Sequence, residues 1–283
     1  MTELLTVENL DVTYRGKGWR KPAFHALKDV SLTIARGETL GLVGESGSGK
    51  TTLGRAVLGL VPVTKGSIRF EGQEISRLSR RQRRGLSRDI QVVFQDPYSS
   101  LNPSMTVEAI LAEPITADGK SRTDASKRVR ELLDRVNLPA DAGRRYPREF
   151  SGGQRQRIAI ARALALEPKL IVCDEPVSAL DLSTQARVLD LFIDIQEQTG
   201  VAYLFVSHDL SVVRHISHRV AVMLRGEIIE TGDGAIGTGA PTPAYTQRLL
   251  LAAPVPDPAL QARRRERYAA LNPSALSTTT ATS

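Results

Sequence analysis

The segment GESGSGKTT, from Gly44 to Thr52, has the glycine spacing of a phosphate-binding loop. It fits the pattern G-x-x-x-x-G-K-[S/T] without a mismatch. Glycines let successive backbone N–H groups point at phosphate oxygens, and the dipole of a following helix favours the same anion. We predict that Lys50 neutralises the outer phosphates of a nucleotide and that Thr51 binds Mg²⁺. The predicted nucleotide-binding residues of this loop are Gly44, Glu45, Ser46, Gly47, Ser48, Gly49, Lys50, Thr51 and Thr52.

Further candidates follow short apolar runs that read as buried strands. In LIVCDEP, Asp174 stands at a strand end, where its carboxylate can hold Mg²⁺, usually through water. Glu175 is placed to polarise an attacking water as a general base. Gln95 closes QVVFQ and is predicted to reach the metal and the water, although an exposed strand-end glutamine is the alternative.

Two aromatic or basic side chains complete this set. His208 ends LFVSH on a strand expected to be parallel to the others, so it should reach the same carboxyl edge of the sheet. A structural histidine is the alternative, but polar strand ends that converge on one edge favour a site. Tyr14 is either a core aromatic or a face on which adenine stacks.

A second glycine turn, SGGQ, lies far downstream. Its residues Ser151, Gly152, Gly153 and Gln154 open a predicted helix, so backbone N–H groups and the serine hydroxyl are available to an anion. A plain helix cap would use the same residues. One chain with one nucleotide site does not need two such turns.

The elements that position these residues alternate between strand and helix. Predicted strands are 38–44, 66–72 and 89–95, then 170–174 and 202–208. Helices are expected at 50–60, 107–138 with a polar interruption, 154–166, after 183, and at 210–216, and a hairpin at 219–232. This alternation predicts an α/β fold with a mostly parallel sheet covered on both faces, and a separate helical lobe in the middle of the chain. Regularity weakens after Gly232, and SALSTTTATS is predicted to be a disordered tail.

Composition excludes several classes. The 283 residues are 41% hydrophobic and 24% charged, as in an ordinary soluble protein. No run is apolar over the length of a membrane span, the amino terminus lacks the features of a secretory signal, and a lone cysteine, Cys173, excludes an internal disulfide. The net charge of +7 is densest at Arg77–Arg88 and Arg263–Arg267, which read as solvated helix faces. Because no aromatic residues or DNA-reading motif accompany them, no nucleic-acid partner is predicted.

Taken in order, the motifs resemble those of the ATP-binding cassette family over roughly Leu4 to Gly232. The matching pieces are Tyr14, GESGSGKTT, Gln95, FSGGQ with Phe150 in place of the common leucine, LIVCDE, SALD ending at Asp181, and His208. The resemblance implies a P-loop ATPase core with a mostly parallel sheet, an antiparallel β subdomain and an inserted α-helical subdomain. It also implies ATP and Mg²⁺ as ligands.

In that family the signature turn SGGQ closes the γ-phosphate of ATP held by the facing subunit. The resemblance therefore implies a head-to-tail dimer with two sandwiched nucleotides, in which Ser151–Gln154 act on the partner's ATP and Asp181 belongs to the loop beside it. Whether the second ABC subunit is identical or homologous stays open.

Finer likeness points to the peptide/nickel import group. It lies in QVVFQDPYSSLNPSMTV, CDEPVSALDLSTQARVL, HDLSVVRHIS and AYTQRLLLAAPVPDP. Pro243–Thr246 departs from the usual His-Pro-Tyr-Thr run, and the cysteines that some relatives use for an iron–sulfur centre do not occur, so no cluster is predicted. The implied domains are 1–232, nucleotide-binding, with its helical subdomain at about 97–160, and 233–283, an importer-type extension.

This likeness implies an ATP-hydrolysing subunit at the cytoplasmic face of the cell membrane. Its implied partners are two transmembrane permease subunits and, indirectly, an extracytoplasmic solute-binding protein. Di- or oligopeptides are the first solute class, and nickel or another small solute is the second. A soluble cassette ATPase acting on ribosomes or DNA, and an exporter motor, are the competing functions. The irregular segment DPYSSLNP, with Tyr98 and Leu101 expected at its surface, is the predicted docking site for the membrane subunits.

Overall fold

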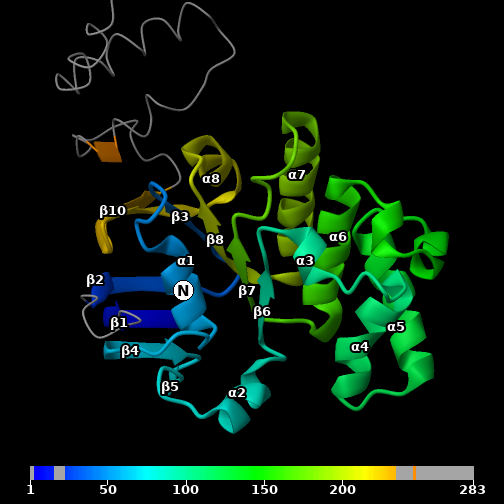
Figure 1. Cartoon of the computed structure of the whole chain (residues 1–283), viewed down its shortest axis with the longest axis horizontal. Coiled ribbons are helices and arrows are strands. Elements are labelled where there is room, and N and C mark those ends of the chain that lie inside the picture. The colour runs from blue at the N-terminus through cyan, green and yellow to red at the C-terminus, as the bar shows by residue number, and fades with distance from the viewer. Residues whose placement is uncertain (1–2, 16–22, 234–244, 247–283) are drawn as a thin grey trace, which may run out of the picture.

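The central sheet has six strands in the order β10-β9-β3-β8-β7-β6 (Figure 1). The computed structural model of the chain describes residues 3–15, 23–233 and 245–246. The strands from β9 to β6 run parallel, and β10 is antiparallel to β9. The mostly parallel sheet and the terminal hairpin are therefore confirmed. The bounds are β3 (Thr39–Val43), β6 (Ile90–Val93), β7 (Leu170–Asp174), β8 (Ala202–Ser207), β9 (Arg219–Leu224) and β10 (Glu227–Asp233).

The apolar runs that predicted the central strands are buried on both faces. Every residue of β3 and β8 is buried, and β7 is buried up to Asp174. Side chains of a strand alternate between the faces, so a run without polar positions requires cover on each side. Because these strands are parallel, their carboxyl ends share one edge of the sheet. The candidates that follow them therefore share that edge.

A second, antiparallel sheet has the order β2-β1-β4-β5. Helix α1 (Lys50–Val57) lies between this sheet and the central one, and Leu53 of α1 joins Leu5 of β1 and Leu204 of β8 in one hydrophobic cluster (Figure 1). This is the antiparallel β subdomain of the ATPase fold. Its strands are β1 (Glu3–Tyr14), β2 (Phe24–Ala35), β4 (Lys65–Phe70) and β5 (Gln73–Glu74).

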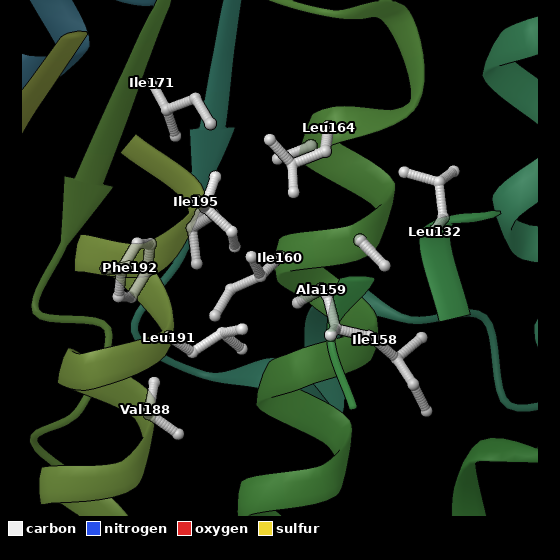
Figure 2. Close-up of a cluster of buried hydrophobic side chains, with 14 of the residues drawn as sticks. Leu132, Ile158, Ala159, Ile160, Leu164, Ile171, Val188, Leu191, Phe192 and Ile195 are labelled. Carbon is white, nitrogen blue, oxygen red and sulfur yellow. The ribbon is translucent and has the colours of Figure 1, made fainter. Parts of the chain in front are cut away.

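Helices cover the other face of the central sheet. Figure 2 shows Leu132, Ile160 and Phe192 from three of these helices in one hydrophobic cluster that also contains Ile171 of β7. The helical subdomain is therefore present, and its hydrophobic packing is continuous with the sheet face rather than separate from it. The helices are α3 (Pro97–Ser100), α4 (Val107–Ala117), α5 (Arg122–Arg135), α6 (Gly152–Ala163) and α7 (Leu182–Thr199), with short 3₁₀ turns at Ala140–Arg144, Pro147–Glu149 and Leu164–Leu166.

Four of these helices begin where a polar side chain caps them. Thr106, Ser121, Ser151 and Asp181 each accept a hydrogen bond from the backbone N–H three residues later. Such caps satisfy N–H groups that have no partner inside the helix, which explains why α4, α5, α6 and α7 start where they do. The remaining helices are α2 (Arg80–Leu86) and α8 (Leu210–Ile216).

The expectation of solvated arginines is wrong for Arg83 of α2. Its guanidinium donates to the carbonyl oxygens of Val57 at 3.0 Å and Ile75 at 2.7 Å, and burial lowers its pKa. Arg83 fastens α2 to the end of α1 and to the antiparallel sheet. Arg263–Arg267, the extension after 246 and its predicted tail lie outside the described residues.

The expectation of an exposed Leu101 is also wrong. Leu101 is 2% exposed and belongs to the cluster beneath the helical layer, whereas Tyr98 is 63% exposed. Tyr98 lies within the single turn of helix α3, and Leu101, which follows that turn, points inward. Within the described residues, no helix has both the length and the apolar character needed to cross a bilayer.

Candidate functional site

The phosphate loop joins β3 to α1 in the strand–turn–helix order predicted from its sequence. Gly49 has a φ of 110°, and a Cβ there would lie 2.8 Å from the carbonyl oxygen of Ala26. A Cβ on Gly44 would lie 2.2 Å from the carbonyl oxygen of Met223. Gly49 is therefore required by its backbone conformation and by the lack of space, whereas Gly44 is required by the lack of space alone.

Lys50 reaches back across this loop. Its side chain is almost fully buried, and its Nζ donates to the carbonyl oxygens of Gly44 at 2.7 Å and Glu45 at 3.0 Å. Burial lowers the pKa of Lys50, and the charges of Glu175, Asp174 and Glu45 oppose that shift. A buried cation enclosed by backbone groups is an arrangement that can bind phosphate oxygens.

Asp174, at the end of β7, lies beside the start of α1. Thr51 donates from Oγ1 to Oδ1 of Asp174 at 3.0 Å. Burial raises the pKa of Asp174, the Thr51 hydrogen bond opposes that shift, and the charge of Glu175 adds to it. The two oxygens predicted to bind a metal ion thus meet in space, and their chemistry suits Mg²⁺.

The raised pKa of Asp174 predicts a trade between stability and binding. A carboxyl whose pKa is higher in the folded protein destabilises the fold once pH exceeds its ordinary value of 3.8. Asp174→Asn should therefore unfold at a higher temperature than the unsubstituted chain at pH 7 without ligand, and this gain should disappear near pH 3. The same variant should lose Mg²⁺-dependent nucleotide binding. Thermal unfolding at both pH values tests the first part, with exposed Asp194→Asn as the control; a lower unfolding temperature at pH 7 would contradict it.

Glu175 and His208 form the second pair at this edge. Nδ1 of His208 lies 3.0 Å from Oε2 of Glu175, so the imidazole donates to the carboxylate. Glu175 has a φ of 49°, in the left-handed region, and its N–H donates to the carbonyl oxygen of Val206 at 3.0 Å. A non-glycine residue in that conformation at a strand end is strained, and such strain concentrates at functional sites.

Gln95 lies at the same edge, beyond β6. Its amide nitrogen donates to Oγ of Ser178 at 3.3 Å, and Ser178 donates to the carbonyl oxygen of Glu175 at 3.0 Å. Gln95 is thereby linked to Glu175 through one side chain. Tyr14 lies near the carboxyl end of the phosphate loop, with its hydroxyl 3.3 Å from Oγ1 of Thr52.

The turn SGGQ begins α6 and is built as a helix start. Ser151 accepts from the N–H of Gln154 at 3.3 Å, and the N–H of Ser151 donates to the side chain of Gln154 at 3.0 Å. Gly153 is required, since a Cβ there would lie 2.2 Å from Cγ2 of Thr184. Ser151 is therefore the cap of helix α6, as the alternative interpretation predicted. Ser151 is also exposed at the amino end of that helix, a position suited to an anion.

The two glycine turns begin helices on opposite faces of the central sheet. Ile171 and Cys173 of β7 share the cluster of α6, whereas Leu170 and Val172 share the cluster of α1. Alternate residues of one strand point to opposite faces, so α1 and α6 cover different sides. Within one chain, the phosphate loop and the SGGQ turn therefore belong to separate layers of the fold.

Asp181 caps α7, close to the SGGQ helix. Its Oδ1 accepts from the hydroxyl of Ser183 at 2.7 Å and from the N–H of Thr184 at 3.0 Å. These hydrogen bonds, that of Ser183 first, hold the pKa of Asp181 well below its usual range. The cap of α7 therefore favours the carboxylate form of Asp181.

Two contacts of the site had no assigned residue in the sequence interpretation. Ser178 stood only as the first letter of SALD, and its bridge between Gln95 and Glu175 was not expected. The sequence around Tyr245 did not predict a contact with the phosphate loop either. Its hydroxyl nevertheless accepts a hydrogen bond from the N–H of Glu45 at 3.0 Å. Two hundred residues separate Glu45 from Tyr245, so no spacing rule could have joined them.

Known proteins match this chain in sequence and in fold. The family model described as ABC transporter matches residues 27–178. The Oligopeptide transport ATP-binding protein OppD of Mycobacterium bovis is 54% identical over 83% of this chain and 38% of its own length. The Glutathione import ATP-binding protein GsiA of Salmonella typhi is 52% identical over 85% of this chain and 39% of its own. A Brucella abortus protein, provisionally named as a peptide import ATP-binding protein, is 50% identical over 88% of this chain and 75% of its own.

Solved structures agree in fold. A dimeric ATP-binding cassette in a post-hydrolysis state, bound to ADP and phosphate, has a TM-score of 0.74 and 30% identity, covering 84% of this chain and all of that one. CbiO1 of Clostridium perfringens, part of an ABC transporter complex, has a TM-score of 0.73 at 28% identity over 83% of this chain and 90% of its own. The chain spans 38% to 39% of the length of the OppD and GsiA relatives. On the family match, the identities and the fold together, this chain belongs to the ABC transporter family.

Proposed function

We propose that this chain hydrolyses ATP and drives a membrane importer for di- or oligopeptides. The observation that carries the ATPase part is the convergence of Lys50, Asp174, Glu175 and His208 on one sheet edge, beside a phosphate loop. The peptide part is supported by relatives at 50% to 54% identity that are named for oligopeptide or peptide import. The relative named for glutathione import favours a second candidate of the same chemistry, a small thiol peptide.

The reaction needs a charge clamp and a base, and the site offers both. Lys50 and the loop N–H groups would hold the β- and γ-phosphates. Thr51, Asp174 and the side-chain amide oxygen of Gln95 would hold Mg²⁺, which when bound neutralises charge on those phosphates. Glu175 would accept the proton of the attacking water, with His208 orienting its carboxylate through the 3.0 Å hydrogen bond.

The remaining parts of the proposal concern assembly. Tyr14 would stack on adenine, Ser151–Gln154 and Asp181 would serve the ATP of a facing cassette subunit, and the domain limits would be 1–232 and 233–283. Two permease subunits would hold the chain at the cytoplasmic face of the membrane, and a solute-binding protein would deliver solute to them. No nucleic acid takes part.

Growth on peptides tests the substrate class. A strain lacking this chain should fail to grow when a di- or tripeptide is the sole source of a required amino acid, and should grow when the free amino acid is supplied. The reason is that the importer alone admits the peptide while other systems admit the amino acid. If peptide uptake is unchanged while nickel-dependent enzyme activity collapses, the peptide assignment is wrong and the importer assignment survives.

Tyr98 tests the docking surface. Its exposed ring packs against the guanidinium of Arg155, whose Cζ lies 3.9 Å from the ring centroid. Tyr98→Ala should leave the ATPase of the isolated chain unchanged and lower its stimulation by the membrane subunits roughly five- to tenfold, as expected for an exposed aromatic anchor. Leu60→Ala, which removes an equally exposed apolar side chain from the segment after α1, is the matched control. If the membrane subunits stimulate the ATPase of Tyr98→Ala as strongly as that of Leu60→Ala, the docking surface lies elsewhere.

A further inference from the structure

Tyr245 and Thr246 are buried against the main body of the protein. Tyr245 is 7% exposed, and its ring packs in a cluster with Val43 at the end of β3 and Leu210 of α8. Thr246 is fully buried and donates from Oγ1 to the carboxylate of Glu230 on β10. This pair of residues therefore anchors the chain beyond β10 at two neighbouring points.

The two anchor points reach different parts of the molecule. Thr246 contacts a strand at the sheet edge, whereas the Tyr245 hydroxyl accepts a hydrogen bond from the N–H of Glu45 at 3.0 Å. Glu45 belongs to the phosphate loop, and its carbonyl oxygen accepts from the N–H of Ser48 at 3.1 Å and from Lys50 at 3.0 Å. Tyr245 thus accepts a hydrogen bond from Glu45, and the carbonyl oxygen of Glu45 accepts one from Lys50.

Open space adjoins the phosphate loop beside Tyr245. A pocket of about 340 Å³ lies there, lined by Glu45–Ser48, by Leu224 at the end of β9, by Arg225 of the following turn, and by Tyr245. In the same turn, the N–H of Gly226 donates to the carbonyl oxygen of Ser48 at 2.8 Å. Since open space adjoins the loop, the hydrogen bond that Tyr245 accepts from Glu45 and the one that Gly226 donates to Ser48 hold the loop where van der Waals contacts are fewer.

We propose that Tyr245 is a positioning residue for nucleotide binding: its hydroxyl fixes Glu45 and keeps the phosphate loop in its open, phosphate-ready shape before ATP enters. This rests on the proposed ATP binding and deepens it. A loop that is already ordered loses less conformational freedom on binding, so Tyr245 acts on affinity. Its hydroxyl meets the phosphate loop at the N–H of Glu45, a backbone group with no proposed role toward the attacking water, so we expect turnover at saturating ATP to be unchanged when that hydroxyl is removed.

Two variants, each altered in one side-chain group, distinguish a positioning role of Tyr245 from an anchoring role. Tyr245→Phe removes the hydroxyl and keeps the buried ring, whereas Thr246→Val removes the neighbouring hydrogen bond to Glu230 and keeps the volume. We expect Tyr245→Phe to raise the Kd and KM for ATP about two- to tenfold, with kcat unchanged. Thr246→Val should leave the Kd unchanged. Equal loss of affinity in both would reduce Tyr245 to an anchor, and an unchanged Kd in Tyr245→Phe would overturn the proposal.

Amide hydrogen exchange provides a readout that needs no nucleotide. In the unliganded chain the N–H of Glu45 should be protected, and in Tyr245→Phe it should exchange at least several-fold faster while amides of β8 stay unchanged. A Glu45 amide that exchanges in the unsubstituted chain as fast as an exposed one overturns the proposal even if the variant fails to fold. If the unsubstituted chain binds no ATP but protects Glu45, the proposed function fails and the role of Tyr245 in shaping the loop stands.

Discussion

Replacing Glu175 with glutamine should slow ATP hydrolysis by a factor of roughly a hundred or more, which is the usual contribution of a positioned general base. The substitution is nearly isosteric, so it preserves the contact with His208, where the glutamine oxygen can still accept from Nδ1. Lys50, Thr51 and Asp174 are untouched, and nucleotide and metal should bind as before. Because bound ATP is not consumed, the variant should accumulate as a nucleotide-held dimer on gel filtration.

The matched control removes a carboxylate from another surface. Glu8 of β1 is exposed in the antiparallel sheet and pairs with Arg69 at 3.6 Å. Glu8→Gln should hydrolyse ATP at the rate of the unsubstituted chain and elute as that chain does. Full hydrolysis by Glu175→Gln would remove Glu175 from the role of base, whatever its position beside His208.

Two inactive variants should restore activity when mixed, if the facing subunit is a second copy of this chain. Lys50→Ala loses the phosphate clamp but keeps SGGQ, and Ser151→Arg does the reverse. Each alone should lose activity about a hundredfold or more, as when a charge-stabilising group is removed. An equal mixture should recover about a quarter of full activity, because about half of randomly paired dimers are mixed and each has one intact site of two.

The control for mixing pairs Lys50→Ala with a double variant that carries both substitutions. No intact composite site can form there, so no recovery is expected. Ser151→Arg also removes the cap of α6, and its unfolding temperature must be compared with that of Ser151→Ala to separate lost folding from lost contact. Absence of recovery at any mixing ratio would mean either that the facing subunit is a different chain or that SGGQ does not act on the partner's ATP. Repeating the mixture with the natural partner subunit separates these two outcomes.

The strands of the central sheet could be predicted because burial on both faces leaves a plain signal. In LIVCD of β7 every residue before Asp174 is apolar, and the end of that run coincides with the end of the strand. Long β1 and β2 carry no such signal. Their pairing shifts register at several places, and Asn9 and Asp29 have positive φ, so polar and apolar residues do not alternate regularly. Resemblance, not periodicity, predicted that sheet.

The candidate site could be predicted as far as single strands and turns extend. Asp174, Glu175 and His208 follow strands whose parallel course brings them together, and the loop glycines match a known spacing. The link through Ser178, the inward turn of Leu101 and the reach of Tyr245 to Glu45 depend on tertiary packing. Local sequence around Leu101, framed by prolines and serines, suggested an exposed segment because a single buried side chain leaves no periodic trace.

The placement of α1 and α6 on opposite faces of the sheet has a consequence for stoichiometry. If the phosphate loop of one chain must meet SGGQ of another, a two-fold pairing satisfies both contacts at once and leaves neither surface free for a third chain. Association would then stop at two chains rather than continue into a filament. Sites would exist in pairs or not at all, and the yield of dimer should rise with the square of the nucleotide concentration while the sites are sparsely filled.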